Sequence, residues 1–281
     1  MPNLIVYKSN KVVEAAYKLS LNEQKIILAC IAKNDSRKPL SVEDRFEITA
    51  KEFSELTGIE INHAYEALQD VAKNLFNRYV IIDNPEPENK KIKKIQTRWI
   101  SSISYMPDNG ALSIRFAFDM LPYLSELKEK FTRYELKNVG GMTSIYGIRL
   151  YELLSQYRSL GRREVVIEWL KSHFEIEGAY KSIADFKKYV IVPAVDNINK
   201  HSDLTLHPPI YKKTGRNVTH IIFDFKTKSS SPVKKPKGTS TSKPVTNLEH
   251  YAVMRARFGD SLPLDAIPVE IIEQLKACGK W

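Results

Sequence analysis

The sequence predicts an α+β protein in which a helix-turn-helix followed by antiparallel strands occurs twice, ahead of a flexible C-terminal tail. Three observations predict this class. Apolar residues recur at spacings of three and four in segments that alternate with short β-rich runs. The same plan starts again after Gly140, as a duplication of architecture without recognisable repetition of sequence. From Lys226 onward, Ser, Thr, Pro, Gly and Lys replace apolar residues, which is typical of a segment that cannot fold by burial.

Length and charge limit the class of protein. The chain has 281 residues, enough to bury at least two modest cores. Its formal net charge of +10 and pI near 9.3 indicate a polyanionic partner, and the lack of a long apolar run favours nucleic acid over a membrane. No signal peptide precedes Tyr7, so we expect a cytoplasmic protein. Cys30 and Cys278 lie far apart, which argues against a disulfide framework or a cysteine-based zinc site, and both are expected to be reduced thiols.

Capping signals define the first helix-turn-helix. Ser20, with Glu23 three residues on, can cap one helix, and Thr49 can cap a second that stops at Gly58 in a left-handed conformation. A turn with glycine between two helices is the signature of this unit. The predicted elements are helices at 21–33, 50–58 and 62–76, with a strand at 45–48.

Three β-rich runs follow, and we predict that they form one antiparallel sheet. The basic loop 90–94 would be the wing of this sheet, and a helix over 122–131 would close the unit. The runs are 79–83, 94–105 and 111–118.

The second unit repeats the plan. Thr143 or Ser144 can cap its first helix, Gly178 lies in the turn, and Ser182 with Asp185 makes a capping pair for the next helix. The predicted elements are a helix to 158, a strand at 162–167 passing into a helix that ends at 174, a helix from 182 to about 200, and strands at 204–206, 210–213 and 218–225 with the hairpin tip at 214–217.

The expected domain organisation follows from these patterns. We predict an N-terminal winged-helix domain, a C-terminal winged-helix domain, a disordered basic linker, and a short helical segment too small to be stable alone. Their bounds are 1–138, 142–228, 229–247 and 248–281.

The helix that begins at Ser182 is the main candidate to enter a DNA groove. Phe186, Val190 and Ala194 should face the core. Lys187 and Lys188 would then face outward, as phosphate anchors more than base readers, because Lys only approximates the bidentate guanine contacts of Arg. A solvated lysine face and a hairpin made soluble by charge are the alternatives. The predicted DNA-binding residues of this unit are Lys181, Ser182, Lys187 and Lys188 on the helix and Lys212, Lys213, Arg216 and Asn217 on the hairpin.

Other charged residues give weaker predictions. Pro193 removes a backbone donor, so it should kink or divide its helix, bend it, or end it early. Arg149, on the polar side of an apolar helix, could pair with Glu152 or Glu168 or touch phosphate, and we favour the pairing. The lysines of the 90–94 loop could equally be solvated. The DNA-binding candidates of the first unit are Asn62, His63, Lys73 and Lys93.

Signatures of enzymes that act on DNA are missing from the sequence. The six histidines include no pair two apart, as a rolling-circle nicking enzyme needs, and no His-x-x-Arg. No G-x-x-x-x-G-K-[ST] sequence occurs, so a helicase would have to be recruited. We therefore predict no enzymatic activity, no catalytic residue, no metal and no cofactor.

Four segments in order, over roughly residues 8–226, resemble the plasmid replication initiators that are built from two winged-helix domains and bind repeated origin sequences called iterons. The resemblance implies a monomer that clamps iteron DNA, a homodimer that represses its own gene at an inverted repeat, and host initiator and helicase partners. It also implies dimerisation through the first domain and most base contacts by the second. The segments are NKVVEAAYKLSLNEQKIILACIAK, SIYGIRLYELLSQY, DFKKYVIVPAVDNIN and KKTGRNVTHIIFDF.

Two other functions stay open at the level of sequence. A winged-helix transcriptional repressor would use the same fold without a part in replication. A nicking endonuclease with an unfamiliar site belongs to another class.

Overall fold

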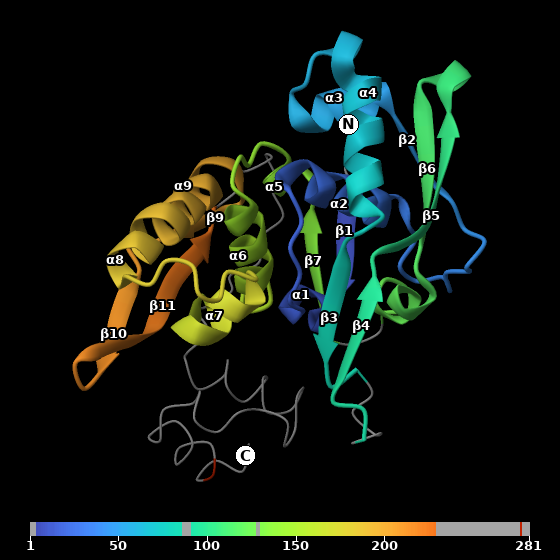
Figure 1. The fold of residues 1–281 in the computed structure, drawn as a ribbon. Coiled ribbons are helices and arrows are strands. Elements are labelled where there is room, and N and C mark those ends of the chain that lie inside the picture. The colour runs from blue at the N-terminus through green and yellow to red at the C-terminus, as the bar shows by residue number, and fades with distance from the viewer. Residues whose placement is uncertain (1–3, 86–90, 128–129, 229–275, 277–281) are drawn as a thin grey trace, which may run out of the picture. The chain divides into compact units, whose positions relative to one another are not determined.

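The computed structural model describes residues 4–85, 91–127, 130–228 and 276. Apart from residue 276, these residues belong to one unit of the chain, Met1–Ser229, in which helices alternate with small antiparallel sheets (Figure 1). The linker predicted at 229–247 and the segment predicted at 248–281 fall outside the described residues, except for Lys276. Among the helices that are described, none is long and apolar enough to cross a membrane.

The capping signals place the N-terminal helices as predicted. Ser20 and Glu23 form a capping box, because the Ser20 side chain accepts from the Glu23 N–H and the Glu23 carboxylate accepts from the Ser20 N–H at 2.6 Å. Thr49 caps the next helix in the same way, and Gly58, at φ 79°, ends it. The helices are α1 (Asn10–Glu14), α2 (Leu21–Lys33), α3 (Ala50–Thr57) and α4 (Ile61–Leu75).

The strands of the N-terminal half form several small sheets, so the prediction of one sheet is wrong. The predicted strand 94–105 divides at Trp99, because residues 94–98 pair with 79–83 whereas residues 100–106 pair with 111–116. The wing is therefore the β3–β4 hairpin alone. The pairings are β1 (Ile5–Ser9) with β7 (Phe131–Glu135), β3 (Tyr79–Asp83) with β4 (Lys94–Arg98), and β6 (Ala111–Phe116) between β2 (Phe46–Thr49) and β5 (Ile100–Met106).

The predicted helix over 122–131 is also wrong in its described part. The chain forms a 3₁₀ helix over Phe118–Tyr123 and then strand β7. Glu126 and Lys130 have φ angles of 52° and 51°, a left-handed conformation that a right-handed helix cannot include. Strand β7 pairs with β1, from the far end of the domain sequence, so local periodicity carried no sign of it.

The elements of the C-terminal half follow the prediction closely. Ser144 is the residue that caps α6, since its hydroxyl accepts from the Gly147 N–H at 3.2 Å. Gly178 lies in the turn at φ 78°. The elements are α5 (Lys137–Gly140), α6 (Ile145–Ser155), β8 (Arg162–Val166), α7 (Ile167–His173), α8 (Ile183–Phe186), a π-helical turn (Lys187–Ile191), α9 (Val192–His201), β9 (Leu204–Leu206), β10 (Ile210–Thr214) and β11 (Asn217–Thr227).

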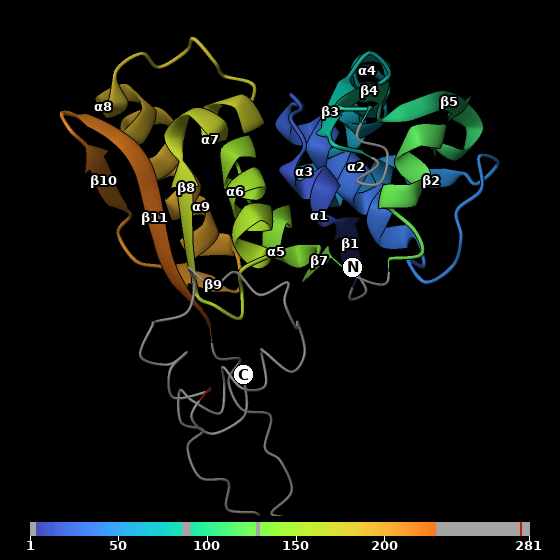
Figure 2. The ribbon, with the colours of Figure 1, turned by 90° about the horizontal axis from the view of Figure 1, so that it is seen from below.

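Strand β11 organises the C-terminal sheet, with β10 and β8 on its two sides and β9 paired to its end. Gly215, at φ 62°, makes the turn of the predicted β10–β11 hairpin. Helix α6 packs against α9 on one side and against α1 and β7 on the other, so it lies between the two halves (Figure 2). Every residue from Gly147 to Ser155 is buried, which makes α6 the element that joins them.

Candidate nucleic-acid interface

The second helix of the C-terminal helix-turn-helix is one run made of α8, the π-helical turn and α9. Ser182 begins it, because its hydroxyl accepts from the N–H groups of Ala184 at 3.0 Å and Asp185 at 3.4 Å. Pro193 does not divide the run. The π-helical turn ends just before it, where the Val192 N–H donates to the Lys187 carbonyl, and the proline occupies the first turn of α9. The helix therefore widens locally instead of ending.

The core-facing side of this run is as predicted, with Phe186, Val190 and Ala194 fully buried. Lys188 is exposed, but Lys187 is half-buried and differs from its prediction. Its ammonium lies 3.6 Å from the ring centre of Tyr211 on strand β10, a cation–π contact that helix periodicity could not reveal. Lys187 is thus partly held by the protein, and Lys188 has the freer charge.

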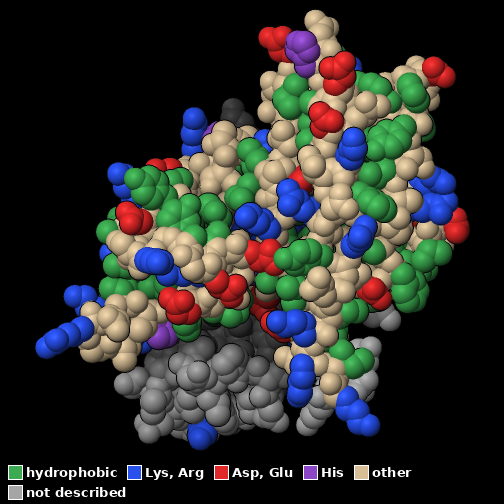
Figure 3. Space-filling model, in the orientation of Figure 1, with side chains coloured by type: hydrophobic (Ala, Val, Ile, Leu, Met, Phe, Trp, Pro, Cys, Tyr) green, Lys and Arg blue, Asp and Glu red, His purple; other side chains and the backbone are tan. Residues whose placement is uncertain are grey.

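The hairpin presents all four predicted residues to solvent: Lys212, Lys213, Arg216 and Asn217. Lys212 forms an exposed ion pair with Glu164 of strand β8 at 3.0 Å. Its charge is partly neutralised. Figure 3 shows Lys and Arg side chains at the tip of this hairpin and over α8 and α9. The wing and the helix therefore offer cations from two elements.

A groove of about 500 Å³ joins the helix start to the wing. Lys181 lines it from the helix side, and Arg216 and Asn217 line it from strand β11 and its turn. Lys171 of α7 adds another cation, and its neighbour Glu168, 3.6 Å away, adds an acidic group. Three predicted residues from separate parts of the sequence thus share one basic concavity, as a polyanion site requires.

The candidates of the first domain do not gather in the same way. Asn62 and His63 are exposed at the start of α4, and Lys73 is exposed in its last turn, so the 15-residue helix separates them. Lys93 is exposed beside the β3–β4 wing, whose tip lies at the opposite end of the domain from the α3–α4 turn (Figure 1). These residues make separate contacts at most. Among the described residues, no group of three or more His, Cys, Asp or Glu could hold a metal ion.

Comparison with known families shows which family the chain belongs to. Residues 5–155 match the family described as Initiator Replication protein, WH1, and residues 166–225 match Initiator Rep protein, WH2. The chain belongs to this replication initiator family. The initiator has two tandem winged-helix domains, as its sequence predicts.

Relatives span most of this initiator. A Replication initiation protein of Escherichia coli is 26% identical over 234 residues, which cover 79% of this chain and 70% of the relative. The PI protein of Escherichia coli is 24% identical over 245 residues, covering 77% and 80%. The crystal structure of Pi initiator protein in complex with iteron DNA aligns with a TM-score of 0.68 at 22% identity, over 82% of this chain and 100% of that one. The two-domain fold is therefore shared.

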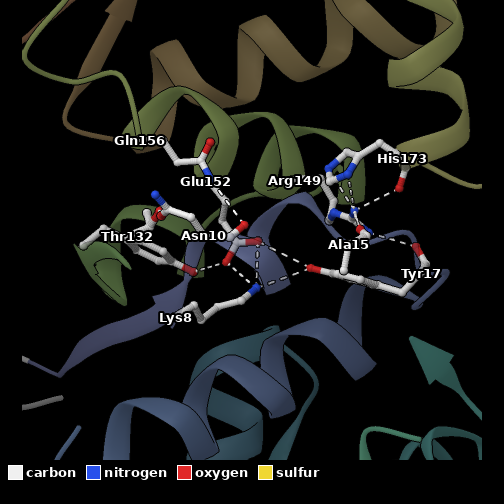
Figure 4. Close-up of polar contacts among 10 residues, drawn as sticks. Lys8, Asn10, Ala15, Tyr17, Thr132, Arg149, Glu152, Gln156 and His173 are labelled. Atoms are coloured by element: carbon white, nitrogen blue, oxygen red, sulfur yellow. Dashed lines mark hydrogen bonds and ion pairs between the residues drawn. The ribbon is translucent and has the colours of Figure 1, made fainter. Parts of the chain in front are cut away.

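A buried ionic cluster fixes α6 of the initiator to its N-terminal domain. The Glu152 carboxylate accepts from the Lys8 ammonium at 2.8 and 3.0 Å and from the Tyr134 hydroxyl at 2.6 Å (Figure 4). Lys8 and Glu152 are 1% and 0% exposed. Burial lowers the pKa of Lys8, but the charge of Glu152, the nearby Tyr17 and the hydrogen bond to Glu152 together outweigh burial and leave the pKa raised. Lys8 and Tyr134 come from strands β1 and β7, and neither carried a local sequence signal.

Arg149, one turn earlier on α6, pairs with neither Glu152 nor Glu168, so that prediction is wrong. Its guanidinium donates to the carbonyls of Ala15 at 2.7 Å, Tyr17 at 2.9 Å and His173 at 2.9 Å, and stacks 3.5 Å from the Tyr17 ring centre. The pairing fails because α6 is buried on all sides, so the Arg149 guanidinium meets backbone carbonyls of the packed segments and not a solvent-facing carboxylate.

His173 ends α7 and lies against this guanidinium, with ring nitrogens 3.0 and 2.8 Å from Arg149 Nη2. Burial, and next the charge of Arg149, hold the pKa of His173 well below its usual value, so the ring is neutral. Arg149 thereby ties α7 of the second domain to the segment that follows α1 of the first (Figure 4).

In the N-terminal domain, burial raises the pKa of the Cys30 thiol to about 12, which makes it an inert core residue.

Proposed function

We propose that this chain initiates plasmid replication by binding iteron repeats of a double-stranded origin as a monomer, without enzymatic activity. Membership of the initiator family and the fold shared with Pi initiator protein, whose structure contains iteron DNA, support the proposal. The observation that carries it is the basic groove, where Lys181 at a helix start and Arg216 with Asn217 on the wing face the same space.

The geometry suggests how DNA would be held. The N-terminal part of the α8–α9 run, on which Ser182 and Lys188 are exposed, would enter the major groove. The wing, with Lys213 and Arg216, would lie along the phosphate backbone and fix the register without reading bases. Helix α4 would make a second contact about 34 Å away, in the next major groove, and the β3–β4 wing would make a separate contact.

The remaining parts of the proposal concern regulation and partners. A homodimer formed through the N-terminal domain, taken as residues 1–138, would repress the initiator's own gene at an inverted repeat. The second domain, 142–228, would be the main base reader. Opening of the origin would need a host initiator and a recruited helicase, because the sequence has no P-loop. These steps take place where plasmid DNA is copied, in the cytoplasm.

The test is to supply the chain in trans to an origin fragment that lacks the initiator gene. We expect the fragment to be established as a plasmid only when the chain is present. Repression of the gene without establishment of the fragment would replace the proposal with a transcriptional repressor. A site-specific nick in supercoiled origin DNA with magnesium would end the claim of no enzymatic activity.

A further inference from the structure

The outward side of the α8–α9 run carries two large apolar side chains among its described residues. Tyr189, in the π-helical turn, and Val192, the first residue of α9, are each 51% exposed. Both side chains therefore leave about half of their surface to solvent on this run. Between them, Val190 and Ile191 are buried and hold the run to the core. The exposed pair therefore contributes little to the fold.

Neighbouring residues order the Tyr189 ring. It stacks on the Tyr180 ring with 6.3 Å between centres and 29° between planes. The ammonium of Lys188 lies 5.0 Å from the Tyr189 ring centre. On the face drawn in Figure 3, hydrophobic side chains lie among Lys and Arg side chains over these helices. Tyr189 thus lies beside a cation of the predicted DNA-binding surface.

Two cations of this surface are already engaged by other side chains of the protein. Lys187 is held over Tyr211, and Lys212 is paired with Glu164. Lys188 and Arg216 can bind phosphate, which is the same at every position of a duplex. The major groove displays polar groups at all base pairs but one apolar group, the C5-methyl of thymine. An exposed apolar pair on a helix in that groove has this methyl as its complementary partner.

We propose that Tyr189 and Val192 determine sequence specificity by contacting the C5-methyl groups of thymines in the major groove. The inference rests on the proposed function, since it takes the α8–α9 run to be the helix that enters the groove. The Val192 methyls would pack on one thymine methyl, and the Tyr189 ring, held by Tyr180, would cover another. Each buried methyl corresponds to about a fourfold change in affinity.

The test replaces thymine by deoxyuridine, which removes the methyl alone. The full chain is titrated against the repeat that footprinting defines beside its own gene, with one thymine replaced at a time. We expect about a fourfold loss at one or two positions. Val192→Ala should bind the natural duplex about fourfold more weakly. It should no longer distinguish deoxyuridine from thymine at the position that Val192 contacts, while the position that Tyr189 covers keeps its penalty. Val42→Ala, which trims a valine 44% exposed in the other domain, is the matched control and should retain the discrimination.

Each outcome decides the inference. If every deoxyuridine duplex binds as tightly as the natural repeat, or if Val192→Ala keeps the full penalty at every sensitive position, the proposed methyl contacts do not exist. In that case, a footprint that persists leaves the proposed function standing and overturns this inference alone. Loss of the footprint itself would overturn both. Because both side chains are on the surface, an unchanged melting temperature will show that each variant is folded.

Discussion

Glu152→Gln removes one charge from the cluster that joins α6 to the N-terminal domain. The Lys8 ammonium, 2.8 Å from the carboxylate and 1% exposed, would lose its charged partner and have no access to water. Breaking a buried ion pair on one side costs about 3–5 kcal/mol, because the remaining charge stays buried. Against a folding free energy of about 5–15 kcal/mol, this is a large share.

Urea denaturation at pH 7 measures the loss as a change in the free energy of unfolding. The matched control is Glu168→Gln. Its ion pair with Lys171 is on the surface, where Glu168 is 81% exposed, and should be worth less than about 1 kcal/mol. The double variant Lys8→Met with Glu152→Leu removes both charges and should recover most of the stability. It also keeps the test usable if Glu152→Gln does not fold.

Two results would refute this reasoning. One is a Glu152→Gln protein within about 1 kcal/mol of the wild type, which would mean that the buried charge of Lys8 is otherwise satisfied. The other is a double variant as unstable as the single one, which would mean that lost packing and hydrogen bonds, and not the unpaired charge, set the cost.

Three further predictions concern the DNA surface, the tail and pH. Lys188→Ala should lower DNA affinity and reduce the slope of log K against log salt by about 0.9. Lys187→Ala should change this slope less, because the Lys187 ammonium sits on the Tyr211 ring. Equal slopes for the two variants in binding titrations would contradict this prediction. Truncation after Lys228 should leave site-specific binding intact, since Lys228 still donates to the Ser202 carbonyl at 2.7 Å. A gel-shift assay of the truncated protein on the repeat measures this binding. Loss of specific binding would assign the tail to the DNA-binding part. Burial lowers the pKa of His173 in the folded state, so the unfolded state takes up the proton first as the pH falls. The stability that His173 contributes is present above its unfolded pKa of about 6.5. Below that pH, the free energy of unfolding falls by up to about 1.4 kcal/mol per pH unit. Denaturation series at several pH values should show a shallower fall for His173→Asn, and an identical slope would exclude this residue as the cause.

Local chemistry explains which parts of the fold could be predicted. Ser20, Thr49 and Ser182 cap helices through groups two or three residues away, so the sequence alone contains the whole interaction. The glycine of the β10–β11 hairpin is similarly local, because the turn needs its left-handed conformation at that one position. For the same reason, the exposed wing residues were predictable from the position of the turn.

The failures all involve partners distant in the chain. Strand β7 exists because β1 pairs with it, and the predicted strand 94–105 divides because its two parts pair with different strands. The Lys187 ammonium lies over the Tyr211 ring, and Arg149 lies among three carbonyls, although both look like solvent-facing cations on a helical wheel. Such contacts are set by tertiary packing, which periodicity in one segment does not encode.

Hydroxyl-radical footprinting of the full chain and of Arg216→Ala on the repeat tests most directly whether the α8–α9 run and its wing bind DNA. The account predicts that one chain protects about two helical turns, roughly 20 base pairs. Arg216→Ala should lose protection only at the backbone that the wing contacts, with the rest of the footprint unchanged. An identical footprint for the two proteins, at equal occupancy, would show that the wing does not lie on the DNA and would contradict the central claim.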